Sequence, residues 1–135
     1  CEKANKNGAQ IEYFKEFIPS KLFEKQIIDS SILLADIPPK LYRDGTEETY
    51  GRTKETGITW LGIKYAKPMI LPKSFKNIPE LDTSIIKYDN IDHLKEIFID
   101  LTPEKIQLLT KQALLNSKNF TLESVKENSQ IKEIT

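Results

Sequence analysis

The stretch Gly57-Ile58-Thr59-Trp60-Leu61-Gly62-Ile63-Lys64-Tyr65 decides the fold that the sequence predicts. More than half of its residues are β-branched or aromatic, and such residues favour extended structure. Alternate residues of a strand lie on one face, and here both faces would carry apolar side chains. The pattern therefore predicts a strand over residues 58–65 that is covered on both sides, with the single tryptophan, Trp60, in the core.

Shorter elements are expected around this strand. Apolar patterns predict a short helix over 10–17, a helix over 21–29 with an apolar buried face, a buried strand over 32–35, a strand over 84–88 and a short helix over 91–99. Residues 69–71 lie between Pro68 and Pro72, so an edge strand or irregular structure is expected there, because proline cannot donate to a central ladder.

The strongest helix signals lie near the C-terminus. Thr102 is a favoured N-cap residue, Pro103 suits the first helical position and Glu104 suits the positive end of the helix dipole. These signals predict a helix over residues 103–117. Together these elements predict an α+β fold in which a small, mostly antiparallel sheet, containing strands 58–65 and 84–88, is packed by an N-terminal and a C-terminal helix.

Length and composition indicate one domain and exclude several classes of protein. The chain has 135 residues, with 20 basic and 20 acidic side chains. A nucleic-acid-binding domain usually has a surplus of Lys and Arg on one face, so no nucleic-acid partner is expected. A single cysteine permits neither an intramolecular disulfide nor a four-cysteine zinc site. We expect a globular domain over 10–126, a flexible tether over 1–9 and a frayed tail over 127–135.

Sequence signatures of catalysis are missing. No phosphate-binding loop, zinc-protease HExxH motif or nucleophile elbow occurs, so we expect a non-enzymatic protein with no catalytic residues and no cofactor. Asp89, Asp92 and His93 are weak candidates for metal ligands, because oxygen and imidazole groups lie close together there. Capping of a helix by Asp89 or Asp92 is the favoured alternative.

The polar segment 43–55 is the candidate binding region. Asp44-Gly45 is a turn signal, so the segment forms either a hairpin tip or a functional loop. Tyr and Arg are enriched at the energetic centres of protein interfaces. The candidate binding residues are Tyr42, Glu47, Glu48, Tyr50 and Arg52. A solvated connector with no binding role is the alternative.

The first eight residues, Cys1-Glu2-Lys3-Ala4-Asn5-Lys6-Asn7-Gly8, form a cysteine followed by a polar run. This arrangement resembles a mature bacterial lipoprotein. The resemblance implies lipid on Cys1, attachment to a membrane of the cell envelope, and, since residue 2 is Glu rather than Asp, an outer-membrane location. A chance fragment that begins at a cysteine is the alternative.

Three functions remain open at this point. The favoured one is a small membrane-anchored domain of the bacterial envelope that binds a protein, such as an immunity protein, an inhibitor or an accessory subunit. The second is an enzyme or ligand binder that acts on a glycan or peptide through loop carboxylates, which would require a carboxylate-lined pocket. The third is a structural subunit of an envelope complex, which would require an exposed apolar patch.

Overall fold

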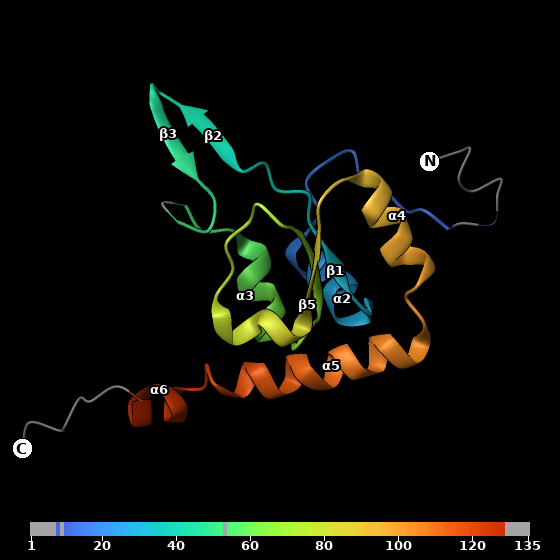
Figure 1. Cartoon of the computed structure of the whole chain (residues 1–135), viewed down its shortest axis with the longest axis vertical. Helices are drawn as coiled ribbons and strands as arrows, with labels where there is room; N and C mark the ends of the chain where they lie inside the picture. Colours follow the sequence, from blue (N-terminus) through green and yellow to red (C-terminus); the bar gives the residue numbers. More distant parts are fainter. Residues whose placement is uncertain (1–7, 9, 53, 129–135) are drawn as a thin grey trace, which may run out of the picture.

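The computed structural model describes residues 8, 10–52 and 54–128 of the chain. In chain order its elements are α2 (Ser20–Asp29), β1 (Leu33–Leu34), β2 (Lys40–Arg43), β3 (Thr46–Thr49), α3 (Gly57–Lys64), β4 (Met69–Pro72), the 3-10 helix η1 (Pro79–Ser84), β5 (Ile85–Tyr88), α4 (Ile91–Ile99), α5 (Pro103–Lys118) and α6 (Leu122–Asn128). Figure 1 shows α5 running along one side of the body and the β2–β3 hairpin projecting from the other.

The central sheet is parallel, so the predicted mostly antiparallel sheet is wrong. Its strand order is β1-β4-β5, and Met69 of β4 pairs with Leu33 on one side and Ile85 on the other. A parallel pair needs a crossover connection of about a dozen residues, and η1 with its flanking loop supplies it between β4 and β5. Among the described residues, antiparallel strand pairing is confined to the β2–β3 hairpin.

The stretch 57–65 is the helix α3, not a strand. Thr56 caps it, since its Oγ1 accepts a hydrogen bond of 3.4 Å from the Ile58 N–H. Ile58 and Leu61 are one helical turn apart and both pack against the core. The helix ends at Lys64. Ala66, two residues later, has a left-handed φ of 49°, and the Lys67 N–H donates to the Gly62 carbonyl at 2.9 Å. This is a Schellman ending with alanine where glycine is usual.

Trp60 therefore lies on the outer side of a helix, and its predicted place in the core is wrong. The side chain is 49% exposed. Gly62 occupies the inner side instead. A Cβ atom at Gly62 would lie 2.7 Å from the Sδ and Cε atoms of Met69, so glycine lets α3 approach β4 closely.

The segment predicted to be an edge strand, residues 69–71, is the centre of the sheet. Met69, Ile70 and Leu71 are 1%, 0% and 0% exposed. The flanking prolines do not interrupt the ladder, because Pro68 precedes the strand and Pro72 is its last residue. The Pro68 carbonyl accepts the Leu33 N–H at 3.0 Å, so proline still contributes its acceptor.

The C-terminal helix prediction is confirmed. Thr102 is the N-cap of α5 and accepts the Lys105 N–H at 3.3 Å, with Pro103 in the first turn. A buried polar contact fastens this helix to η1. The Asn116 side-chain amide donates to the hydroxyls of Thr83 and Ser84, each at 3.0 Å. Asn116 and Ser84 are 8% and 1% exposed, so the hydrogen bond between them lies in the interior, whereas Thr83 is exposed.

Other predicted elements had mixed outcomes. Residues 10–17 contain no helix, whereas α2, β1, β5 and α4 agree in type with the predicted 21–29, 32–35, 84–88 and 91–99 elements. The strand β1 is only half buried, since Leu33 is 7% exposed and Leu34 is 46% exposed. The predicted buried face of α2 is wrong, because none of its residues is buried. Asn90, rather than Asp89 or Asp92, caps α4, and its Oδ1 accepts two backbone N–H groups at 3.0 Å.

Candidate functional site

The candidate binding region folds as the β2–β3 hairpin. Asp44 and Gly45, with φ of 50° and 77°, form the two-residue turn that their sequence predicts. In Figure 1 the hairpin projects away from the three-stranded sheet. The two strands contact each other extensively, and neither makes extensive contact with another described element. The segment is therefore an arm with little support from the core.

One face of this arm carries a small polar network. The Tyr42 hydroxyl donates to the Glu47 carboxylate, and Lys40 Nζ lies 2.7 Å from the same carboxylate. The Lys40 hydrogen bond is the largest cause of the lowered pKa of Glu47, and the bond to Glu47 raises the pKa of Tyr42. These groups are solvated, so the network orders the arm without adding much stability. Tyr42 remains 71% exposed.

The base of the arm is held more firmly. Tyr50 is partly buried and packs against the core cluster. Lys54 Nζ lies 2.7 Å from the Glu48 carboxylate and 5.9 Å from the centroid of the Tyr50 ring. Gly51, with a φ of 78°, packs so closely on the next loop that a Cβ atom there would lie 2.1 Å from the Lys76 carbonyl oxygen. The base of the hairpin is thus fixed against loop 73–78.

A cavity of about 310 Å³ opens beside this base, between the loop after β3, the first turn of α3 and the loop that precedes η1. Its wall includes Arg52, Glu55, Thr59, Trp60 and Lys76. Phe75, Ile78 and Pro79 supply apolar surface to the same wall. A volume of this size suits a small molecule or a single anchor side chain.

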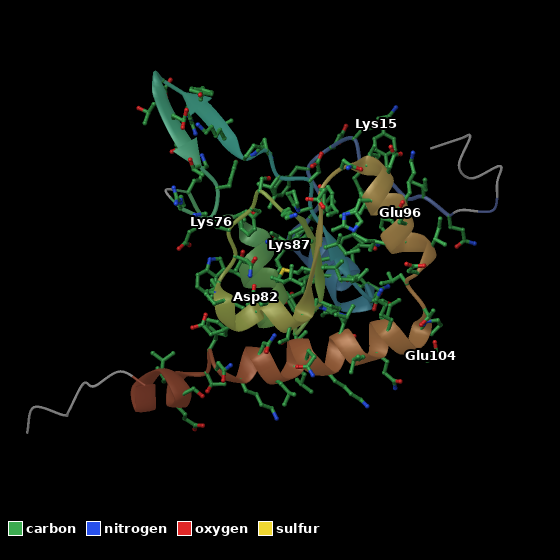
Figure 2. All side chains as sticks on the ribbon, viewed as in Figure 1. Lys15, Lys76, Asp82, Lys87, Glu96 and Glu104 are labelled. Atoms are coloured by element: carbon green, nitrogen blue, oxygen red, sulfur yellow. The ribbon has the colours of Figure 1, made fainter. Side chains whose placement is uncertain are left out.

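The charges around the cavity are mixed, with an excess of positive groups. Glu55 accepts a hydrogen bond of 3.1 Å from the Trp60 indole N–H. Lys54 is already paired with Glu48. Arg52 and Lys76 form no ion pair with any residue that the structure describes. Figure 2 shows Lys76 beside the base of the hairpin.

A half-buried lysine contacts Phe75, a residue of the cavity wall. Lys87, labelled in Figure 2, donates to the Phe75 carbonyl at 2.7 Å, and its Nζ lies 5.3 Å from the centroid of the Phe75 ring. Burial lowers its pKa. These contacts fix the loop that carries Lys76.

The structure brings most of the predicted binding residues into one region but gives them different roles. Tyr42 and Glu47 lie on one face of the arm, and Glu48 lies on the other with Lys54. Tyr50 packs against the core, and Arg52 lines the cavity. The wall residues Thr59 and Trp60 were missed, because 57–65 was interpreted as a strand, and Lys76 was missed because nothing in the loop sequence distinguishes it from other surface lysines. Thr56 before an apolar pair three residues apart was the signal for a helix N-terminus.

The two aspartates among the weak metal candidates form ion pairs with lysines. Asp89 lies 3.1 Å from Lys73 Nζ and 3.3 Å from His93 Nδ1, and Asp92 lies 2.8 Å from Lys95 Nζ. The hydrogen bond from Lys73 is the largest cause of the lowered pKa of Asp89. Within the described ranges, no group of three or more His, Cys, Asp or Glu side chains could hold a metal ion.

The loop carboxylates do not assemble as an acid–base site at this cavity. None of Asp44, Glu47, Glu48, Asp89 and Asp92 lines its wall. The pKa values of Glu47 and Asp89 are lowered, whereas a general acid needs a raised one.

The predicted lipid site, Cys1, lies outside the described residues, as does the tether over 1–9 apart from Gly8. The lipid anchor and the envelope location stay predictions. In residues 10–52 and 54–128, no helix combines the length and apolar character needed to cross a membrane. Comparison with protein-family models, with curated proteins and with solved structures found no match to this chain.

Proposed function

We propose that this chain is a binding domain that engages a protein partner through the β2–β3 hairpin. The observation that carries this function is the projection of the hairpin from the body, with Tyr42 71% exposed. An isolated two-stranded hairpin is at best marginally stable in water, so this hairpin adds little to the stability of the domain. A partner that packs against the arm would supply the missing contacts.

The surface of the arm suits a protein partner. Its strands are paired only with each other among the described residues, so the outer edge of β2 keeps backbone groups that another strand could pair with. Tyr42 and Arg43 are both exposed, and Tyr and Arg are residue types that dominate interface energies. The polar network of Lys40, Tyr42 and Glu47 holds that face in one arrangement, which lowers the entropy lost on binding.

Capture of partners from an extract of the source cells tests this function, with the unaltered domain and two tyrosine variants as bait. Tyr42→Ala should lose about 2 kcal/mol of binding energy, roughly a thirtyfold weaker capture. Tyr13→Ala is the matched control, because Tyr13 is 58% exposed and lies outside the hairpin. Capture of one partner equally well by the folded domain and by both Tyr42→Ala and Arg52→Ala would exclude the hairpin and its base.

A structural subunit is a second candidate, favoured by the large exposed apolar side chains. Phe17, Ile99 and Leu122 are 92%, 81% and 71% exposed. Burial of such groups in an assembly would remove apolar surface from water. Measurement of the mass of the native complex by light scattering distinguishes the two: a large fixed assembly supports a subunit, and a monomer that binds one partner supports the binding domain.

A further inference from the structure

The cavity beside the hairpin base coincides with the start of α3. The first turn of a helix leaves backbone N–H groups without intrahelical acceptors, and it is the positive end of the helix dipole. Here the cap is weak, since Thr56 Oγ1 accepts only the Ile58 N–H, at 3.4 Å. Thr56, Thr59 and Trp60 all line the cavity, so this helix end faces an open space.

A nearly buried residue of the same wall carries a hydroxyl that has no partner in the described chain. Thr59 is 8% exposed, and its hydroxyl forms no hydrogen bond with any residue that the structure describes. No fully buried side-chain oxygen or nitrogen in the described chain lacks a partner, so the hydroxyl of Thr59 keeps some accessible surface, and Thr59 is a residue of the cavity wall. A buried hydroxyl without a partner is costly unless a bound group or water satisfies it.

Besides Lys54, two cationic side chains line this cavity. Arg52 and Lys76 line the cavity from two different loops and have no ion-pair partner in the described ranges. Glu55 is the carboxylate of the wall, and it accepts the indole N–H of Trp60. Trp60, Phe75 and Ile78 add apolar surface to the same wall. The wall therefore combines positive charge, a free hydroxyl donor and apolar surface.

We propose that this cavity binds a small organic oxyanion, a carboxylate or phosphate joined to an apolar group. The oxyanion would lie at the start of α3 between Arg52 and Lys76 and would accept the Thr59 hydroxyl. The apolar group would pack on Trp60. This site does not depend on the partner of the hairpin, so each proposal can fail without the other.

Trp60 is the only tryptophan in the sequence, so its fluorescence reports binding directly. We would titrate the domain with phenyl phosphate, benzoate and the neutral analogue benzamide. Phenyl phosphate and benzoate should give a saturable change that weakens as salt rises, and benzamide should not. The stronger of the two acids identifies phosphate or carboxylate as the preferred group.

Variants locate the site. Arg52→Gln and Lys76→Gln should each weaken binding about tenfold, and Thr59→Val, which keeps the side-chain shape, about three- to tenfold. Lys111→Gln on the exposed surface of α5 is the matched control and should leave binding unchanged, as should Tyr42→Ala. Unfolding midpoints confirm that each variant is folded. No saturable response, an equal response to benzamide, or full binding by Arg52→Gln and Lys76→Gln together would overturn the proposal.

Discussion

Gly51→Ala tests the packing that joins the hairpin to the body. Gly51 has a φ of 78°, and a Cβ atom there would lie 2.1 Å from the Lys76 carbonyl oxygen and 2.9 Å from its carbonyl carbon. A left-handed alanine costs about 1 kcal/mol. Overpacking against backbone adds about 1–3 kcal/mol. The free energy of unfolding should therefore fall by about 2–4 kcal/mol.

Gly45→Ala is the matched control. Gly45 has nearly the same φ, 77°, but a Cβ atom there would meet nothing within 4 Å. This variant should cost only the left-handed term, about 1 kcal/mol, and mainly within the hairpin. Urea denaturation followed by circular dichroism measures both variants, and hydrogen exchange of the hairpin amides separates local from global loss. Equal losses for the two variants would refute the close packing of Gly51 on Lys76.

Three further predictions concern the body of the fold. Ala66→Gly should raise the free energy of unfolding by about 0.5–1 kcal/mol, because Ala66 has a φ of 49°; a lower melting temperature would contradict this. Asn116→Ala should cost about 1–3 kcal/mol in urea denaturation, since the buried Ser84 hydroxyl loses its donor; a loss under 0.5 kcal/mol would contradict it. Burial, with the hydrogen bond to Asp36, raises the pKa of Tyr88 to about 12. The neutral Tyr88 hydroxyl therefore contributes to the free energy of unfolding below about pH 10, and this contribution is lost as the pH rises toward 12. Tyr88→Phe should abolish this pH-dependent loss of stability.

Elements with local signals could be predicted from the sequence. Thr102, Pro103 and Glu104 define the start of α5 whatever the rest of the chain does. Asp44-Gly45 likewise defines the hairpin turn, because few other residue pairs tolerate two positive φ angles. The same turn signal lies within the candidate binding segment, residues 43–55.

The parallel sheet could not be predicted in the same way. Residues 57–65 contain β-branched residues that favour a strand, yet Ile58 and Leu61 also fit one face of a helix, and packing on the core decides between the two. Residues 69–71 have prolines at both ends, and these prolines argued against a central strand. The strand is central nevertheless, because the prolines lie at its ends and do not interrupt its ladder. Because 57–65 was interpreted as a strand, the position of Thr59 and Trp60 in the cavity wall could not be predicted.

Photocrosslinking in the source cells tests the binding function most directly. A photoreactive phenylalanine analogue would replace Tyr42 on the exposed hairpin in one variant and Tyr13 in another, since both side chains are exposed. Our account predicts one specific protein adduct from position 42 and none, or a far weaker one, from position 13. A folded domain that forms no adduct from position 42, or the same adducts from both positions, would contradict a protein-binding role for the hairpin.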